Sequence, residues 1–355
     1  MEKRILILAG GTGGHIFPAL AVARELKKEG LDVQWLGSKV GMESEIVLDE
    51  FPMSYVSIKA IRGKSLPSKL LSPLRLLLAT WQAWRVIHRL NPDLVLGMGG
   101  FVSGPGGVAA RLARKPLVIH EQNAVAGLTN RILSKVAKVV LQGFPNAFPK
   151  KVRAETIGNP VRPAILRLSS PAERLREREA PLRILVLGGS RGARAINQMM
   201  VRVLSQYPDE KALHVWHQVG KLDIETVQRS YRSIPVRTTV EVFIKNMAEA
   251  YSWADLVICR SGALTISEIA VAGLASILIP FPYAVDDHQY YNGAYLANAG
   301  AAELFRQKEL TDARLTQMIQ GFVNDRQQLM AMAEKARILA KPEALSTIVN
   351  TCKIL

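Results

Sequence analysis

The chain has 355 residues, a formal net charge of +16 and two cysteines, Cys259 and Cys352. This length predicts two domains, and the few cysteines, with neither a signal-peptide pattern nor a run of ~20 apolar residues, exclude a disulfide-rich or membrane-spanning protein and favour the cytoplasm. The positive charge predicts an anionic partner, either a phosphorylated substrate or an anionic membrane, unless it serves solubility alone; no zinc spacing or RNA-binding aromatic motif supports nucleic acid.

An apolar run from Arg4 to Leu8 opens the chain and is typical of a strand buried on both faces of a parallel sheet. A glycine-rich turn follows, and then a helical pattern that ends at Gly30. Similar apolar runs recur at helix-sized intervals, at residues 33–36, 94–96, 117–119 and 139–141. This alternation of strands and helices predicts a doubly wound α/β domain.

Residues 61–90 form a segment that is both apolar and basic. An amphipathic helix with aromatic and basic side chains is suited to a membrane interface, and each lysine or arginine near an anionic surface contributes ~1 kcal/mol. We therefore predict that this segment binds anionic membrane lipids, with the alternative that its leucines pack into the core. The residues expected at the membrane are Leu71, Leu74, Arg75, Leu78, Trp81 and Arg85.

The second half of the chain repeats the plan of the first. The run from Arg183 to Leu187 leads into a further glycine loop, and later apolar runs lie at residues 215–216, 240–243, 256–259 and 277–279. Pro160 and Pro163 break regular structure between the halves. We therefore expect two doubly wound domains, residues 1–160 and 161–340. Because ligands bind at the carboxyl ends of the strands in such sheets, two facing domains would enclose a cleft.

Glycine-rich loops follow three of the predicted strands. Without a Cβ, glycine lets the backbone approach a ligand closely, and a helix N-terminus after such a loop presents N–H groups to a phosphate. One such loop is often only a tight turn, but loops in both halves indicate diphosphate-bearing ligands in both domains. They match neither the dinucleotide-binding nor the nucleoside-triphosphate spacing. Their residues are Gly10, Gly11, Thr12, Gly13 and Gly14; Gly97, Gly99, Gly100, Gly104, Gly106 and Gly107; and Gly188, Gly189, Ser190 and Gly192.

Polar side chains at predicted helix starts indicate how a diphosphate is held. Ser190 and Thr265 offer hydroxyl and backbone donors, although both residue types also serve as plain N-caps. Glu268 lies in an otherwise apolar helix, where a carboxylate either accepts both hydroxyls of a ribose or simply faces solvent. No Asp-X-Asp motif or histidine cluster at ligand spacing occurs near the loops. We therefore expect no metal and no cofactor, with helix dipoles and side-chain donors in place of a metal.

Together these motifs resemble the MurG family of GT-B glycosyltransferases, over the length of the chain. The resemblance implies two facing Rossmann-like α/β domains with parallel sheets and an interdomain cleft. The first is expected to bind acceptor and membrane, and the second UDP-GlcNAc. The last helix, from about Ala331 onward, is expected to return to the first domain, to which residues 341–355 are assigned. The motifs that carry the resemblance are His15 after the first loop, residues 97–107, His120 to Asn123, Gly158 to Arg162, the third loop, Cys259 to Thr265, Ser267, Glu268 and Gln289.

The family moves N-acetylglucosamine (GlcNAc) from UDP-GlcNAc to the C4 hydroxyl of N-acetylmuramic acid (MurNAc) in undecaprenyl-pyrophosphoryl-MurNAc-pentapeptide, called lipid I, and so forms the peptidoglycan precursor lipid II. The resemblance implies this inverting hexosyl transfer for the present chain. It also implies a peripheral protein at the cytoplasmic face of the inner membrane, with a part in cell wall synthesis, cell shape and cell division.

The family further implies roles for individual residues. His15 is the expected general base, since imidazole side chains exchange protons near neutral pH, and Glu121 is the second candidate. The expected donor-binding residues are Thr12, Gly13, Gly14, Asn123, Arg162, Ser190, Ile244, Ala263, Leu264, Thr265, Ile266, Ser267, Glu268 and Gln289. The acceptor diphosphate is expected at Gly10, Gly11, Gly99, Gly100, Gly104, Gly106 and Gly107.

Other functions fit parts of the same pattern. One is another GT-B transferase with a different sugar or lipid acceptor. A second is a UDP-GlcNAc 2-epimerase on the same fold, which needs neither a lipid acceptor nor a membrane surface. A nucleic-acid binder would account for the charge of +16 but would leave the glycine loops unexplained.

Overall fold

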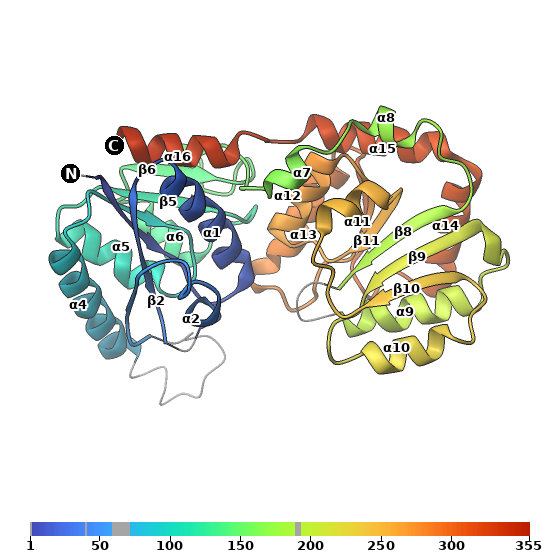
Figure 1. The fold of residues 1–355 in the computed structure, drawn as a ribbon, viewed down its shortest axis with the longest axis horizontal. Coiled ribbons are helices and arrows are strands. Elements are labelled where there is room, and N and C mark those ends of the chain that lie inside the picture. The colour runs from blue at the N-terminus through green and yellow to red at the C-terminus, as the bar shows by residue number, and fades with distance from the viewer. Residues whose placement is uncertain (1, 40, 59–71, 189–192) are drawn as a thin grey trace. The chain divides into compact units, whose positions relative to one another are not determined.

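The computed structural model describes residues 2–39, 41–58, 72–188 and 193–355 (Figure 1). The chain divides into two compact units, Met1–Val161 with Pro342–Leu355, and Arg162–Lys341. Each division lies one residue from the boundary expected from the sequence. Each unit is built on a parallel β-sheet with helices in its crossover connections.

The described part of the first unit holds a sheet of seven strands in the order β3-β2-β1-β4-β5-β6-β7. Every strand expected from an apolar run of this half is present, whereas the two edge strands, β3 and β7, were not expected. The strands are β1 (Arg4–Leu8), β2 (Asp32–Gly37), β3 (Met53–Tyr55), β4 (Leu94–Gly97), β5 (Leu117–Glu121), β6 (Val139–Gln142) and β7 (Ala154–Thr156).

Alternate side chains of β1 point to opposite faces of the sheet, so each face has its own core. Ile5 and Ile7 pack with α1 and α16, while Leu6 and Leu8 pack with α4 and α5. Burial on both faces is the reason that β1 appears in the sequence as one continuous apolar run. The helices in the described part of this unit are α1 (Gly13–Lys28), α2 (Glu43–Ile46), α4 (Ser72–Leu90), α5 (Ser103–Leu112), α6 (Leu128–Leu133) and α16 (Ala344–Ile354).

The second unit has a parallel sheet with the order β10-β9-β8-β11-β12-β13. Its strands are β8 (Leu182–Leu187), β9 (Leu213–Gln218), β10 (Arg237–Glu241), β11 (Leu256–Cys259), β12 (Ala275–Leu278) and β13 (Ala302–Leu304). Its helices are α7 (Pro163–Leu166), α8 (Pro171–Leu175), α9 (Arg194–Ser205), α10 (Ile224–Tyr231), α11 (Met247–Trp253), α12 (Ala263–Ala272), α13 (His288–Ala297), α14 (Asp312–Asn324) and α15 (Arg326–Ile338). Short 3-10 turns lie at Glu210–Ala212 and Val285–Asp287.

The C-terminal segment is shared between the units. The expectation that the last helix begins at about Ala331 is wrong, because α15 ends at Ile338 and the last helix, α16, begins at Ala344. Leu329 and Met332 on α15 join the core of the second unit, to which residues 161–340 were assigned. Only α16 lies in the first unit, beside α1 (Figure 1). There the Lys353 ammonium binds the Glu29 carboxylate at 2.6 Å.

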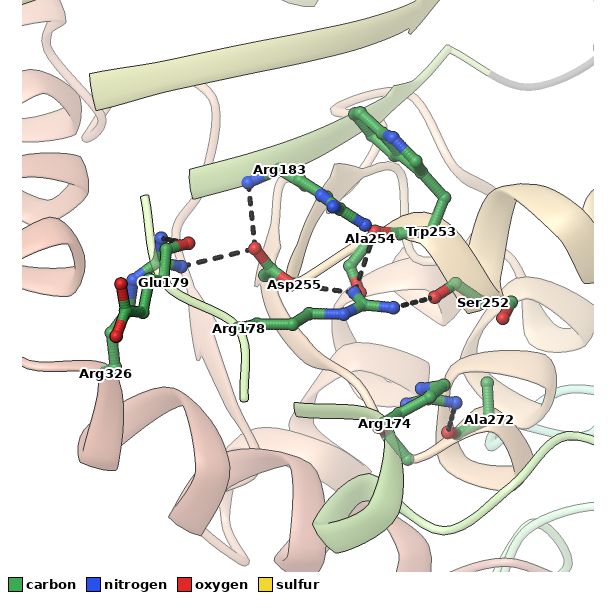
Figure 2. A network of polar contacts seen from close by, with 11 residues as sticks. Arg174, Arg178, Glu179, Arg183, Ser252, Trp253, Ala254, Asp255, Ala272 and Arg326 are labelled. Atoms are coloured by element: carbon green, nitrogen blue, oxygen red, sulfur yellow. Dashed lines mark hydrogen bonds and ion pairs between the residues drawn. The ribbon is translucent and has the colours of Figure 1, made fainter. Parts of the chain in front are cut away.

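Asp255, just before β11, anchors the segment that leads into the second sheet (Figure 2). Its Oδ1 accepts from Arg178 Nη1 at 2.8 Å, and its Oδ2 accepts from Arg183 N at 2.9 Å and Arg326 Nη1 at 3.2 Å. The carboxylate is buried, and such a charge is tolerated only when it is paired and hydrogen-bonded. These contacts join α15, the strand β8 and the segment after α8 at one end of the sheet.

Arg174 closes the C-terminus of α12 (Figure 2). Its guanidinium donates to the carbonyl oxygens of Ala272 and Gly273, both at 2.8 Å. Gly273 ends the helix with φ +60°, and a cation at this end is favoured by the helix dipole. Burial, and then the charges of Arg178 and Arg337, lower the pKa of Arg174 to about 10. The contact fixes α12, whose other end belongs to the candidate site.

His217 on β9 is buried in a small polar cluster of the second unit. Its Nδ1 accepts from the Tyr231 hydroxyl at 2.8 Å, and its Nε2 donates to Asn197 Oδ1 at 3.1 Å. Burial lowers the pKa of His217 from its ordinary 6.5 to about 3. The imidazole is therefore neutral in the folded protein and takes up a proton on unfolding at intermediate pH.

We expect the second unit to lose stability in acid because of His217. The free energy of unfolding keeps its full value, as far as His217 is concerned, above pH 6.5. It decreases as the pH falls from 6.5 toward about 3, by up to about 1.4 kcal/mol per pH unit. Hydrogen exchange of β9 amides, followed between about pH 7 and about pH 5, measures this change. The His217→Gln variant does not titrate and should show a flatter pH dependence; equal slopes for the two proteins would contradict the assignment.

Candidate active site

The loops after β1 and β4 meet at the carboxyl edge of the first sheet. β1 lies between β2 and β4, so this edge is the switch point at which doubly wound sheets bind ligands. Gly11, Gly99 and Gly100 have φ of +97°, +95° and +83°. A Cβ on Gly100 would lie 1.9 Å from the carbonyl oxygen of Gly10. The two loops therefore touch through their backbones, and residue 100 must be glycine.

Glu43 on α2 holds the first loop in place, a role that sequence analysis did not anticipate. Its carboxylate is fully buried. It accepts from Gly11 N at 3.0 Å and from the Ser38 amide and hydroxyl, each at 2.9 Å. A buried carboxylate requires such donors. Glu43 thus ties the loop after β1 to the end of β2.

The first turns of α5 contain Gly104, Gly106 and Gly107, so the prediction that the second glycine loop extends to these residues is wrong. Gly106 and Gly107 are buried. A Cβ would lie 2.8 Å from Leu8 Cδ1 at Gly106 and 2.6 Å from Leu133 Cδ2 at Gly107. The absence of side chains at these two positions lets α5 pack closely on β1 and α6.

Thr12, Gly13 and Gly14 form the N-terminus of α1. Within this helix, which the structure describes in full, Thr12 makes no side-chain capping hydrogen bond and no acidic residue stands in the first turn, whereas Lys27 and Lys28 stand in the last. The first-turn N–H groups and the helix dipole therefore favour an anion at this end.

His15 lies in the first turn of α1, partly exposed, directly after the glycine loop. Its backbone N–H donates to Thr12 O at 3.0 Å, and its Nδ1 lies 3.0 Å from Gln122 Oε1. A Cβ on Gly99 would lie 2.5 Å from Nδ1, so the imidazole packs against the second loop. The predicted base therefore lies where both loops meet the residues that follow β5.

Glu121, the second candidate for the base, is buried at the end of β5. Its carboxylate accepts from Asn123 N at 3.0 Å, Gly127 N at 3.1 Å and Asn130 Nδ2 at 2.9 Å. The Asn123 side-chain amide also donates to it at 3.3 Å. These contacts hold the loop after β5 in place. Because they occupy the Glu121 carboxylate, they favour His15 as the base.

The corresponding edge of the second sheet lies at β8 and β11, where the strand order changes direction. The third loop, with Ser190, falls at residues 189–192 and lies outside the described residues. Helix α12 follows β11 with Gly262 as N-cap, and this fully described helix has no acidic residue in its first turn. Its N–H groups offer the predicted anion site. The residues of its first turns are Ala263, Leu264, Thr265, Ile266 and Ser267.

Glu268 on α12 is buried, with a relative exposure of 8%, so the alternative that it faces solvent is wrong. Arg162 contacts both carboxylate oxygens, at 2.9 Å through Nε and 3.2 Å through Nη2, and the Tyr251 hydroxyl donates to Oε2 at 3.0 Å. Burial raises the pKa of Glu268, and the charge and hydrogen bonds of Arg162 oppose this rise. Tyr251 is a further site residue that sequence analysis missed.

Two other residues that are predicted to contact UDP-GlcNAc, Ile244 and Gln289, form hydrogen bonds within the second unit. The backbone N–H of Ile244 donates to Gln218 Oε1 at 2.9 Å. The side-chain oxygen of Gln289 accepts from Phe281 N at 2.8 Å, so the amide NH2 is its remaining donor end for a ligand. The ordering of both groups before a ligand arrives lowers the entropy cost of binding.

Helix α4 has one buried face and one exposed face. Ala79, Ala83 and Ile87 are buried. The guanidinium of Arg85 lies over the Trp81 ring, 5.0 Å from its centroid. The alternative that all the leucines of this segment pack inward is wrong, since the large exposed apolar side chains here are Leu74, Leu76, Leu77, Leu78 and Trp81. Of the predicted membrane patch, the exposed members are Leu74, Arg75, Leu78, Trp81 and Arg85, and Leu71 lies outside the described residues.

Over the described ranges, no three or more His, Cys, Asp or Glu side chains are grouped so as to hold a metal ion. None of the helices in the described part of the chain combines the length and apolar character needed to cross a bilayer.

Comparison with known proteins defines the class. Residues 5–142 match the glycosyltransferase family 28 N-terminal domain, and residues 183–348 match the glycosyltransferase family 28 C-terminal domain. The calicheamicin glycosyltransferase CalG4 shares the fold, with a TM-score of 0.70 at 14% identity over 100% of this chain and 98% of its own. The two Rossmann-like units with parallel sheets are those of a GT-B glycosyltransferase.

The relatives are more specific. A Coxiella burnetii protein named UDP-N-acetylglucosamine–N-acetylmuramyl-(pentapeptide) pyrophosphoryl-undecaprenol N-acetylglucosamine transferase is 54% identical over 99% of this chain and 98% of its own. A Marinobacter nauticus protein of the same name is 48% identical over 99% and 97%. The crystal structure of Acinetobacter baumannii MurG matches with a TM-score of 0.88 and 41% identity over 99% of this chain and 100% of that one. The chain belongs to the MurG family.

Proposed function

We propose that this protein transfers GlcNAc from UDP-GlcNAc to the C4 hydroxyl of MurNAc in lipid I, giving lipid II with inversion at the anomeric carbon. The observation that carries the proposal is 54% identity, over 99% of the chain, to a relative whose name states this sugar, donor and acceptor. A helix N-terminus with no acidic residue in its first turn lies at the sheet edge of each unit and supports the proposal, because such an end favours an anion and both substrates bear a diphosphate.

The second unit is proposed to bind the donor. The N-terminus of α12, with Thr265, receives the diphosphate, and Glu268 accepts the ribose hydroxyls while it remains paired with Arg162. The backbone at Ile244 contacts uracil, and Gln289 contacts the sugar. Negative charge grows on the diphosphate as UDP leaves, and each donor aimed at that charge contributes ~3 kcal/mol in the transition state.

The first unit is proposed to bind the acceptor. The loops after β1 and β4 hold its diphosphate, and His15 receives the proton of the C4 hydroxyl as that oxygen attacks the anomeric carbon. The bond to the UDP oxygen breaks as the new glycosidic bond forms. Direct displacement of this kind converts the α-linked donor into a β-linked product.

Transfer of labelled GlcNAc from UDP-GlcNAc to a lipid I analogue, with and without EDTA, tests the proposal. We expect labelled lipid II under both conditions. No transfer by folded protein would overturn the assigned acceptor or donor. Incubation with UDP-GlcNAc alone is the matching control, since a 2-epimerase converts this nucleotide without an acceptor and a transferase leaves it intact.

We further propose that the exposed face of α4 rests on the cytoplasmic leaflet, where the lipid tail of the acceptor is anchored. Leu74 and Leu77 are 67% and 68% exposed, and Trp81 is 51% exposed beside Arg85. Helices α5 and α6 add Leu112 and other exposed apolar side chains. Aromatic and aliphatic groups with adjacent cations suit the boundary between headgroups and acyl chains.

The proposed membrane surface predicts binding to anionic vesicles that weakens with added salt. The double variant Leu74→Ser/Leu77→Ser should bind about tenfold more weakly or worse, because two large apolar contacts are lost. Leu222→Ser is the matched control, since Leu222 is 91% exposed but lies in the second unit. Vesicle co-sedimentation measures both. Binding that is equal in the three proteins would rule out this face, and binding insensitive to salt would rule out its electrostatic part.

A further inference from the structure

Behind the proposed base, a chain of hydrogen bonds leads into the interior of the first unit. His15 Nδ1 contacts Gln122 Oε1 at 3.0 Å. Gln122 Nε2 contacts His120 Nδ1 at 3.1 Å, and His120 Nε2 contacts the carbonyl oxygen of Gly158 at 2.9 Å. Gln122 and His120 are buried, at 1% and 0% relative exposure. The roles of donor and acceptor along this chain follow from its ends.

The orientation of the Gln122 amide is set by a backbone carbonyl. Gln122 Nε2 lies 3.0 Å from the carbonyl oxygen of Met98, which can only accept. The amide atom facing Met98 must therefore be the NH2 group, and the amide oxygen must face His15. The backbone is held as well, because Asn159 Nδ2 donates to Gln122 O at 3.1 Å.

The tautomer of His120 agrees with this orientation. The Gly158 carbonyl can only accept, so His120 Nε2 carries a proton. Complete burial lowers the pKa of His120, which keeps the ring neutral and leaves a lone pair on Nδ1. That lone pair accepts the second N–H of Gln122. Every member of the chain is thus satisfied in only one arrangement.

We propose that Gln122, oriented by Met98 and His120, is a positioning residue that holds His15 as the Nδ1–H tautomer with the Nε2 lone pair directed to substrate. An amide oxygen only accepts, so the proton it binds must sit on Nδ1 of His15. Gly99 supports the geometry, since its missing Cβ leaves room for the imidazole. This inference rests on the proposed role of His15 as the base that accepts a proton at Nε2.

The tautomer itself can be observed without catalysis. Full-length protein with 15N-labelled histidine, assigned by comparison with His15→Asn, gives the protonation of each ring nitrogen from its 15N chemical shift. We expect His15 to be protonated at Nδ1 and bare at Nε2, although free histidine favours the opposite tautomer. Gln122→Leu should lose this preference. A His15 ring with its proton on Nε2 in the unaltered protein would overturn the proposal.

Steady-state kinetics test the consequence. Gln122→Leu should lower kcat about ten- to a hundredfold, because only a fraction of His15 is then in the competent tautomer, with little change in the KM for UDP-GlcNAc. In a His15→Ala background the same substitution should cost nothing further, since Gln122 acts through His15. Gln142→Leu is the matched control: Gln142 is a buried amide at the end of β6 that pairs with Thr156. Additive losses in the double variant would contradict the proposal that Gln122 acts through His15.

The two ideas fail separately. If His15→Ala keeps its kcat, the base assignment is wrong, while the tautomer measurement still tests whether Gln122 positions His15. If His15 in the unaltered protein is the Nε2–H tautomer, the positioning role of Gln122 is wrong even when His15→Ala is inactive. Thermal unfolding measures how much of the Gln122→Leu protein is folded. A loss of kcat that only matches the loss of folded protein would also overturn the positioning role of Gln122.

Discussion

Replacement of His15 by alanine should lower kcat by about 10²- to 10⁴-fold, the usual contribution of a general base. The affinity for UDP should change little, because the contacts proposed for its diphosphate, ribose and uracil, at Thr265, Glu268 and Ile244, lie in the second unit. His15 stands at the end of the first glycine loop with its Nδ1 bound to Gln122, so its Nε2 is the nitrogen that can take the acceptor proton. Single-turnover transfer and UDP binding by calorimetry separate the two effects.

His15→Asn is the decisive control for this experiment. The Asn side-chain amide can replace the Nδ1–H contact to Gln122 but supplies no basic nitrogen. If His15 is the base, the asparagine variant should be as slow as the alanine variant. Recovery of most of the activity in His15→Asn would show that His15 only shapes the loop. A loss confined to KM would make it a binding residue.

Replacement of Glu268 by alanine should weaken UDP binding by about a hundredfold. Two ribose hydroxyls that donate to a carboxylate are worth about 3 kcal/mol together. The substitution also leaves Arg162 and Tyr251 without the acceptor that they share. Once donor is saturating, kcat should fall much less than the affinity, because the ribose lies away from the reacting bond. Calorimetry with UDP measures the affinity, and thermal unfolding without ligand reports any loss of stability.

Two companion variants interpret the Glu268 result. Tyr251→Phe removes one hydrogen bond to the carboxylate but keeps the charge, so UDP binding should weaken less than tenfold. Glu268→Gln keeps an acceptor oxygen and should fall between the two. Unchanged UDP affinity in a folded Glu268→Ala protein would remove Glu268 from the donor site and leave it as the partner of Arg162.

The sequence predicts the strands buried on both faces well and the edge strands poorly. β3, β7 and β13 have three residues each and are mostly half-exposed. A strand of this length shows neither a continuous apolar run nor a recognisable alternation. Central strands such as β1, in which four fully buried apolar side chains follow Arg4, are easier to recognise, and β1 is predicted with the observed bounds.

The glycines show how local pattern can mislead. Those at 99 and 100 adopt left-handed φ and form the loop, as expected. Gly106 and Gly107 belong to a helix, where they serve the close approach of α5 to its neighbours. In the sequence, both kinds form one glycine-rich run. Only the packing against Leu8 and Leu133 distinguishes a loop glycine from a packing glycine.

The sequence by itself determined the α/β class, the two-domain plan and the glycine-rich loops after β1 and β4, because apolar runs, glycines and prolines act through local backbone preference. The tertiary structure decided which side chains meet. His15 and Gln122 are 107 residues apart, and Arg162 and Glu268 are 106 apart. Parallel strands joined by crossover helices bring such distant residues to one edge of a sheet. The direction of each hydrogen bond, and hence the tautomer of a histidine, depends on carbonyls that no local pattern identifies.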